Sequence, residues 1–323
     1  MIPPSLPADL KSALDAKLEG QPRGEISARA AQISKTYRDG GSSIAIRSET
    51  DALAYAIVRM PATYAAVSSS LNALCETRPD FAPKSLLDVG AGPGTASWAA
   101  AGGFPSLQKF TLLDVNPALR TLALELGRDH ARLREMTYRR DQTGAALEAS
   151  ESADLVVASY LIGEIGEAER EALAERLWAR TRDTLLVVEP GTPAGYARII
   201  ALRKRLIADG AHVAAPCPHD GACPLSAPDW CHFAQRLPRL RAHIQVKGAE
   251  VPFEDEKFSY VALTRTRMAK RFSRVLAPAA VTKIEVTAKL CTAAGLQRVK
   301  VPHRDKIAYA RARRWSWGES LPD

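Results

Sequence analysis

Three of the five cysteines in this 323-residue chain lie within fifteen positions, in the segment CPHDGACPLSAPDWCHF (217–233). They are Cys217, Cys223 and Cys231. Thiolates bind zinc and iron–sulfur clusters, and a tetrahedral site needs four ligands. The segment contains too much Pro, Asp, His and Gly for a core strand or helix, so packing does not explain its cysteines. It therefore predicts a metal-binding loop that takes one more ligand from elsewhere.

The candidates for the fourth ligand are Cys291, His219 and His232. The segment KIEVTAKLC (283–291) alternates strictly, as a strand does, and Cys291 lies on the face opposite to the apolar one. The apolar face carries Ile284, Val286, Ala288 and Leu290. Because Cys75 lies in an apolar helical pattern and suits a helix core, Cys291 is the best fourth ligand.

Four thiolates suit either Zn²⁺ or an iron–sulfur cluster. Structural zinc sites usually pair their cysteines across two to four residues, and the gaps here, five and seven residues, are wider. The Cys-Pro pairs at 217–218 and 223–224 stiffen the loop. The spacing slightly favours iron–sulfur, and zinc is the alternative.

A second chemical motif is the glycine loop LLDVGAGPGT (86–95). Gly90, Gly92 and Gly94 follow Asp88 at every second position, where side chains would keep the backbone from closing on a ligand. A dinucleotide fingerprint requires glycine at position 95, which is threonine. NAD is therefore disfavoured, and this form is typical of S-adenosylmethionine (SAM) methyltransferases.

Carboxylates after successive strands suit the ammonium, sulfonium and ribose diol of SAM. We expect Asp88 to attract the methionine end and Asp114 to accept both ribose hydroxyls. Asp141 would receive the adenine amino group, and Ser159, after the fourth strand, completes the expected cofactor site. The alternative is that Asp114 and Asp141 only cap the helices that follow them.

The sequence identifies no catalytic residue. Ser159-Tyr160-Leu161-Ile162 stands where enzymes that methylate exocyclic amines place Asn/Asp-Pro-Pro-aromatic, and no cysteine ends the fourth or fifth strand to act as a nucleophile. Tyr160 and Glu164 could line the acceptor side, although Tyr160 could equally pack under a helix.

The segments between these motifs predict an α/β protein with a doubly wound sheet of the class I SAM-methyltransferase type. The runs KSLLDVG, FTLLDVN, ADLVVASYL and DTLLVVEPG alternate with helical patterns, which is typical of parallel strands covered on both faces. Four regions are expected: an N-terminal helical region (1–80), a SAM-binding domain (81–200), a cysteine-rich insertion (201–257) and a C-terminal region (258–323). The last contains a final sheet strand, a β-hairpin with the fourth cysteine and a basic helix. A helix over 281–294 is the competing interpretation of the hairpin.

Charge is distributed unevenly along the chain. Residues 1–196 contain 21 Lys and Arg against 25 Asp and Glu, whereas residues 197–323 contain 23 Lys and Arg against 11 Asp and Glu. The second part, at about +12, favours a polyanionic partner such as nucleic acid over a merely solvated surface. With 46% hydrophobic residues and no apolar run of membrane-spanning length, we expect a soluble cytoplasmic protein without membrane contact.

Several segments together resemble one family, the mitochondrial small-ribosomal-subunit methyltransferase-like proteins and their bacterial relatives. The resemblance runs from about residue 45 to 319. Its most specific part is the order of the cysteines in the segment 217–233, called the cysteine loop below. Its tail departs slightly, with Trp317-Gly318-Glu319 where the family commonly has Trp-Gly-Asp. The segments that carry this resemblance are LLDVGAGPGTASWAA, VVEPGTPAGY, CPHDGACPL, DWCHFAQRLPR, KFSYVAL and YARARRWSWGE.

The resemblance implies a SAM-type fold that carries a [4Fe-4S] cluster and acts on the small ribosomal subunit during late assembly. The family's four cluster cysteines match Cys217, Cys223, Cys231 and Cys291, and the basic second half then has 16S-type ribosomal RNA as its partner. A SAM-dependent rRNA methyltransferase, monomeric when free, is the favoured function. The alternative is a non-catalytic RNA-binding assembly factor that retains the fold.

Overall fold

Apolar runs of the sequence form the strands of one large sheet in the computed structural model, which describes residues 1–38, 41–141, 143–239, 243–244 and 251–322. The sheet order is β3-β2-β1-β4-β5-β8-β6, and β7 pairs with the free half of β8. The first five strands are parallel, whereas β8 runs antiparallel to its three neighbours. The strands are β1 (Ser85–Val89), β2 (Lys109–Asp114), β3 (Thr137–Arg140), β4 (Ala153–Ser159), β5 (Thr181–Pro190), β6 (His212–Ala215), β7 (Phe233–Pro238) and β8 (Phe253–Thr264).

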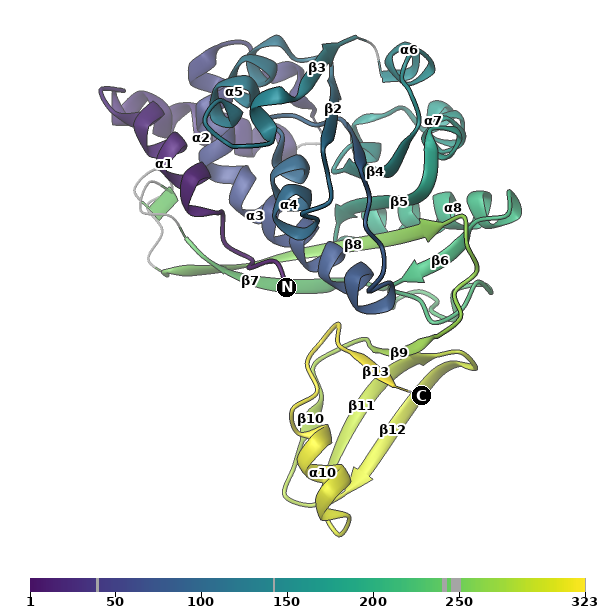
Figure 1. The fold of residues 1–323 in the computed structure, drawn as a ribbon. Coiled ribbons are helices and arrows are strands. Elements are labelled where there is room, and N and C mark those ends of the chain that lie inside the picture. Colours follow the sequence, from purple (N-terminus) through teal and green to yellow (C-terminus); the bar gives the residue numbers. More distant parts are fainter. Residues whose placement is uncertain (39–40, 142, 240–242, 245–250, 323) are drawn as a thin grey trace.

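Helices cover both faces of this sheet (Figure 1). Leu86 of β1 joins the core beneath α1 to α5, and the next residue, Leu87, joins the core beneath α6 to α8. This alternation explains why the strands are apolar throughout. The predicted doubly wound fold class is therefore confirmed. The helices are α1 (Ala8–Leu18), α2 (Arg23–Arg38), α3 (Glu49–Thr77), α4 (Thr95–Gly103), α5 (Pro117–Gly127), α6 (Thr143–Glu148), α7 (Glu167–Ala179) and α8 (Pro193–Ala208).

The N-terminal region is helical, as the sequence predicts. Its longest helix, α3, begins with a capping box in which the Ser48 hydroxyl accepts from Asp51 N and the Asp51 carboxylate accepts from Ser48 N. The helix packs against β8 and α4, and it buries Leu71 and Leu74 beside the half-buried Cys75. None of the described helices combines the length and the apolar character that a bilayer span requires.

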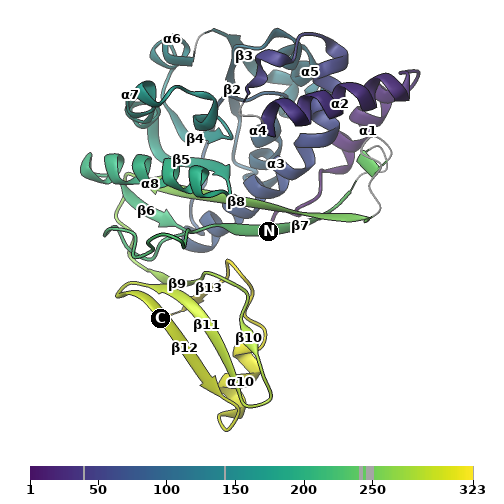
Figure 2. The same ribbon diagram turned by 180° about the vertical axis from the view of Figure 1, so that it is seen from behind.

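A smaller antiparallel sheet lies beside the α/β body (Figures 1 and 2). Its order is β10-β11-β9-β13, and β12 pairs with β11 through a turn at 292–295, so the predicted hairpin is confirmed and a helix over 281–294 is wrong. Ile284 precedes β11 and is 74% exposed, so its predicted place on the apolar face is also wrong. The elements are β9 (Phe272–Val275), β10 (Ala280–Val281), β11 (Glu285–Thr292), β12 (Gly295–Pro302), α10 (Lys306–Ala312) and β13 (Ser320–Pro322).

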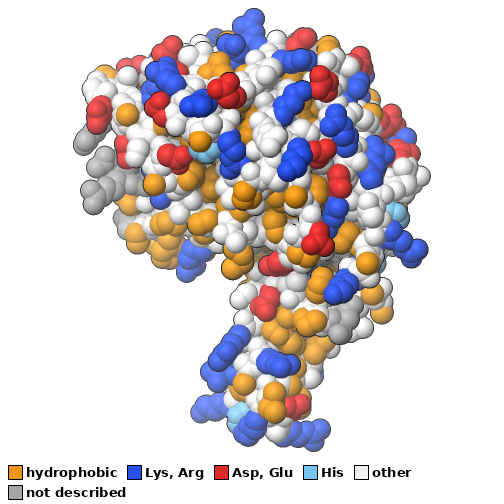
Figure 3. Space-filling view, viewed as in Figure 1, with side chains coloured by type: hydrophobic (Ala, Val, Ile, Leu, Met, Phe, Trp, Pro, Cys, Tyr) orange, Lys and Arg blue, Asp and Glu red, His pale blue; other side chains and the backbone are white. Residues whose placement is uncertain are grey.

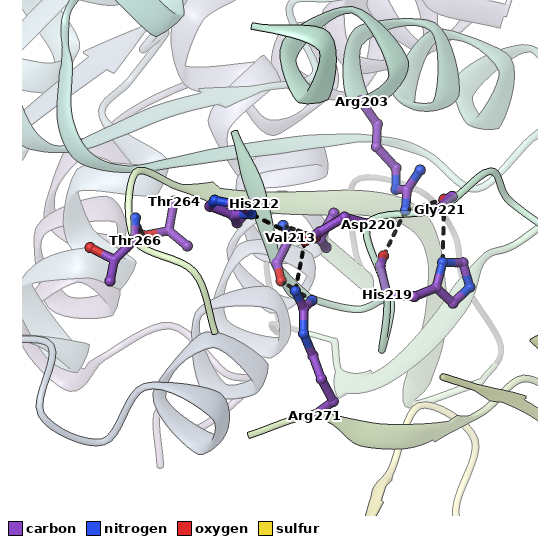
Figure 4. Close-up of polar contacts among 9 residues, drawn as sticks. All are labelled: Arg203, His212, Val213, His219, Asp220, Gly221, Thr264, Thr266 and Arg271. Carbon is purple, nitrogen blue, oxygen red and sulfur yellow. Dashed lines mark hydrogen bonds and ion pairs between the residues drawn. The ribbon is translucent and has the colours of Figure 1, made fainter. Parts of the chain in front are cut away.

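The cysteine loop connects the two bodies. Asp220 in the loop accepts from Val213 N of β6 at 2.7 Å and from Arg271 Nη2, just before β9, at 2.8 Å. Arg271 also donates to the Val213 carbonyl, so the loop, β6 and the start of the smaller sheet share one network (Figure 4). Lys289 of β11 adds an ion pair to Asp229 at 2.6 Å.

Replacing Gly195 with alanine should destabilise the protein. A Cβ there would lie 1.9 Å from the Pro190 carbonyl oxygen, so α8 would have to shift away from the end of β5. We expect Gly195→Ala to lower the free energy of unfolding by about 1–3 kcal/mol, measured by thermal or denaturant unfolding. Gly24→Ala is the matched control, because Gly24 is also helical but has open space around it. Equal stability of the two variants would contradict this geometry.

Candidate functional site

The glycine loop lies between the carboxyl end of β1 and the start of α4. Gly90, Gly92 and Gly94 all have left-handed backbones, with φ of 69°, 53° and 81°. At Gly90 a Cβ would also lie 2.7 Å from Leu161, so both the backbone conformation and the nearby side chain favour glycine there. The loop thus brings its backbone close to a cavity at the carboxyl ends of β1, β2 and β4, where ligands bind in open α/β sheets.

Four of the predicted cofactor residues line this cavity, and three do not. Gly90, Gly92, Asp114 and Ser159 contribute to its wall, together with residues that reach it from the N-terminal helices. Asp88, Gly94 and Asp141 are outside the lining. Asp141 is an exposed residue directly after β3.

Asp114 ends β2 and braces the glycine loop. Its Oδ2 accepts from Gly92 N at 2.8 Å, and its Oδ1 accepts from Asn116 N at 2.8 Å. Burial raises the pKa of this carboxyl, and hydrogen bonds from the backbone N–H groups of Asn116, Gly92 and Val115 partly offset that rise. The carboxylate therefore lies at the cavity wall, at the carboxyl end of β2. Asn116, not Asp114, caps α5 with its side chain.

Asp88 is fully buried beneath the loop. Its Oδ2 accepts from Ser97 N at 3.0 Å and from the Ser97 hydroxyl at 2.7 Å, which fixes the first turn of α4. Its Oδ1 has no hydrogen-bond partner among the described residues. Burial raises its pKa to about 7, although the Ser97 hydrogen bonds act in the opposite direction.

Local sequence patterns did not indicate that the N-terminal region reaches this cavity. Ser43, in the short helix Ser43–Ala45 between α2 and α3, donates from N and Oγ to Glu164 Oε2 at 3.1 and 3.0 Å. Asn116 Nδ2 donates to the Ser43 carbonyl at 2.9 Å. Tyr37 and Tyr55 complete this wall, with ring centroids 5.8 Å apart. The hydrogen bonds of Ser43 join residues 73 and 121 positions apart, which local sequence patterns do not reveal.

Tyr160 carries the strained backbone of the site. It follows β4 with φ 57°, an uncommon value for a bulky residue, and it lines the cavity. Its hydroxyl donates to Glu256 Oε1 of β8 at 2.7 Å, and Arg59 of α3 lies 6.0 Å from its ring centre. Such strain is maintained when surrounding contacts determine it, and it is common at functional sites.

The four cysteines of the predicted metal site lie within electrostatic range of one another, three of them in the cysteine loop and Cys291 in β11. Burial raises the pKa of Cys217, Cys231 and Cys291, and the charge of neighbouring thiols raises each further. For Cys291 the pKa rises to about 12, with Cys217 and Cys223 among the causes. The chain therefore brings together thiols from residues 217 to 291. As they stand, the described residues include no group of three or more His, Cys, Asp or Glu side chains placed to hold a metal ion.

The other two candidate ligands have different surroundings. His219 Nε2 lies 3.6 Å from Cys291 Sγ. His232 stacks on Trp230 and meets Trp317 edge to face, both at 4.9 Å between ring centroids. The cysteine loop and the Trp-Gly tail, two of the segments that carry the resemblance, are thus in contact.

Strand order, glycine loop and cavity together define a class I SAM-methyltransferase-type α/β protein. The family described as mitochondrial small ribosomal subunit Rsm22 matches residues 49–322. The chain belongs to this family, and the resemblance found in the sequence is confirmed.

Curated relatives are similar over most of this chain. The human protein named "Ribosome assembly protein METTL17, mitochondrial" is 29% identical over 289 residues, which cover 84% of this chain and 62% of that protein. The "Rsm22-cox11 tandem protein 2, mitochondrial" of Schizosaccharomyces pombe is 26% identical over 90% of this chain and 45% of its own length. The chain thus spans less than two thirds of these relatives. Both names contradict the expectation of a cytoplasmic protein, because both are called mitochondrial.

Solved structures with a related fold include a putative RNA methyltransferase from Pyrococcus horikoshii, 15% identical with a TM-score of 0.41 over 62% of this chain and 81% of that one. Another is the magnesium protoporphyrin IX methyltransferase of Synechocystis, solved with bound SAM. It is 14% identical with a TM-score of 0.41 over 64% of this chain and 80% of that one.

Asp88 should make the stability of the protein depend on pH. Its pKa is about 7 in the folded state, compared with the usual 3.8. Between pH 3.8 and 7, Asp88 is therefore protonated in the folded protein and ionised in the unfolded chain. This contribution to stability is present at low pH and is lost as pH rises to about 7. Asp88→Asn keeps an acceptor for Ser97 but cannot ionise. The free energy of unfolding of the variant, compared with that of wild type, should therefore rise as the pH is raised from 5 to 7.5. Denaturant unfolding at several pH values measures this difference. A constant difference would contradict the buried-carboxyl assignment.

Proposed function

We propose that this protein binds SAM in the cavity at the glycine loop and acts on the RNA of the small ribosomal subunit. The observation that carries the proposal is the Asp114 carboxylate beside Gly92 at the end of β2, in the cavity wall. Glu164 adds a second carboxyl to that wall, and a cavity with two carboxyls suits a ligand that carries an ammonium and a sulfonium. SAM supplies a methyl group when bound, and Asp114 and Ser159 would hold its ribose and methionine parts.

The charge of the smaller sheet supports an RNA partner. Residues 271–323 contain 11 Lys and Arg against 4 Asp and Glu. Lys and Arg side chains gather on the lower body in Figure 3. Most of the exposed cations, including Arg298, Arg304 and Arg314, have no ion-pair partner within the described chain. Such a surface suits contacts to phosphates. The ribosomal names of the family and of the human relative make small-subunit RNA the specific candidate.

We further propose that Cys217, Cys223, Cys231 and Cys291 hold a [4Fe-4S] cluster, with zinc as the alternative. The thiols lie within electrostatic range of one another, and Cys217 and Cys231 pack against two different hydrophobic cores. A metal centre there would join the cysteine loop to β11 and so stabilise the RNA-facing sheet.

A second candidate is a non-catalytic assembly factor that retains the fold for RNA binding. Ser159 and Tyr160 occupy the position of the acceptor motif, and the Tyr160 hydroxyl is already bonded to Glu256. The Ser43 segment is bonded to Glu164 at the same wall. This closed acceptor side favours the second candidate, whereas the intact glycine loop favours the enzyme.

Asp114→Asn should weaken SAM binding about tenfold or more, because it removes the charge and leaves one acceptor oxygen for two backbone donors, Gly92 N and Asn116 N. Calorimetry with SAM measures this, and transfer of labelled methyl to small-subunit RNA or its precursor particle measures activity. Asp141→Asn is the control, since Asp141 is outside the cavity lining, and it should bind SAM within about twofold of wild type. Wild-type SAM binding without any methyl transfer would contradict the enzyme and favour the assembly factor.

Protein purified without oxygen should be brown, with broad absorption near roughly 400 nm and with bound iron and sulfide. Cys217→Ser should lose this absorption and destabilise the smaller sheet, measured by proteolysis and unfolding. Cys75→Ser should keep the absorption, because Cys75 belongs to α3 and is not one of the four proposed ligands. A colourless protein with stoichiometric zinc would overturn the iron–sulfur proposal.

A further inference from the structure

Two buried arginines flank the four cysteines. Arg203 of α8 is 3% exposed, and Arg274 of β9 is 1% exposed. Neither forms an ion pair with a carboxylate in the part of the chain that the structure describes. A buried cation is costly unless an anion or a full set of hydrogen bonds compensates it, so this pair requires an explanation.

Backbone carbonyls satisfy only part of this requirement. Arg203 Nη2 donates to the carbonyls of His219 and Gly221, each at 2.8 Å, and Figure 4 shows it reaching from α8 into the cysteine loop. Its Nε is buried and has no hydrogen-bond partner among the described residues. Arg274 donates to the carbonyls of Pro216 at 3.2 Å and Gly318 at 2.7 Å. Carbonyls orient the guanidinium groups but carry no charge that would neutralise them.

The charges of both arginines act on the thiols. Arg203 and Arg274 each oppose the burial that raises the pKa of Cys217 and Cys291, and Arg274 does so at Cys231. Arg203 is also close enough to Cys217 for a side-chain hydrogen bond. The two guanidinium groups, Arg203 from α8 and Arg274 from β9, therefore lie within electrostatic range of these cysteines.

A third donor comes from the same helix as Arg203. Tyr196 is seven positions earlier on α8, two turns away and on the same face. Its hydroxyl donates to Cys223 Sγ at 3.2 Å. One face of α8 thus presents a hydroxyl and a guanidinium to the cysteine loop.

We propose that Arg203 and Arg274 compensate the negative charge of a metal centre bound by the four thiolates, and that Tyr196 adds a hydrogen bond to its Cys223 sulfur. This inference rests on the proposed metal site and extends it to the residues around the ligands. Such partners commonly tune a metal centre as much as the ligands do.

Two consequences follow. Loss of a compensating cation should make the metal easier to remove, whatever the metal is. For an iron–sulfur cluster, a low-potential one-electron donor such as dithionite adds an electron to an already anionic centre and breaks no bond. Neighbouring cations and sulfur hydrogen bonds stabilise that more negative state, so their removal should lower the reduction potential.

The test compares Arg203→Gln with Arg205→Gln in the full-length protein purified without oxygen. Arg205 is two positions further on α8 but pairs with Glu171, Glu175 and Asp209 at the surface. We expect Arg203→Gln to release metal to a chelator at least tenfold faster than wild type, and Arg205→Gln to match wild type. In dithionite titrations, Arg203→Gln should shift the midpoint downward by about 59 mV, equivalent to a tenfold change in the one-electron equilibrium constant.

Two further variants keep the test informative if Arg203→Gln folds poorly. Tyr196→Phe removes only the hydroxyl and should also lower the midpoint. Arg203→Lys keeps the charge but not the planar guanidinium, and it should restore most of the metal retention. Wild-type release rates and midpoints in both Arg203→Gln and Tyr196→Phe would overturn the inference with the cluster intact. Zinc in the wild-type protein would instead overturn the iron–sulfur proposal, and the chelator comparison would still decide the role of Arg203. A wild-type protein that holds no metal would overturn both.

Discussion

The contact between the cysteine loop and the smaller sheet determines how the two bodies of this protein sit together. Asp220, Arg271 and Arg274 connect β6, the loop and β9 through a few short polar contacts, most of them at least partly buried. Burial of these polar and charged groups is favourable only when each forms hydrogen bonds or ion pairs. The basic sheet therefore takes its orientation from the same residues that surround the four thiols.

The SAM-type cavity depends on a different constraint, the common edge at which parallel strands end. β1, β2 and β4 bring Gly90, Asp114 and Ser159 to one wall although these residues are far apart in the sequence. The N-terminal helices then close the opposite side through Ser43 and Tyr37. The two sides of the cavity are thus built by separate parts of the chain, and this explains why the side formed by the strand ends was the more predictable of the two.

The cysteine loop and the Trp-Gly tail are far apart in the sequence but contact each other in the fold. Gly318 offers its carbonyl to Arg274, and Trp317 packs against His232. Gly318 has a left-handed backbone with φ 90°, and a Cβ there would lie 3.1 Å from Phe233. Glu319 accepts from Ser316 N within the tail and is exposed, so the departure from aspartate falls outside these contacts.

The sequence by itself determined the strands, the glycine loop, the β-hairpin and the identity of the clustered cysteines. These features follow from local periodicity, from glycine geometry and from residue types that few other roles explain. Only the tertiary structure decided that Asp88 supports α4 from beneath the loop, that Asp141 lies outside the cavity, and that Ser43 and Tyr37 belong to it. It alone also placed Arg203 and Arg274 beside the thiols. A carboxylate or guanidinium at a strand end or on a helix carries no local mark of its partner, because burial and long-range contacts choose that partner after the chain has folded.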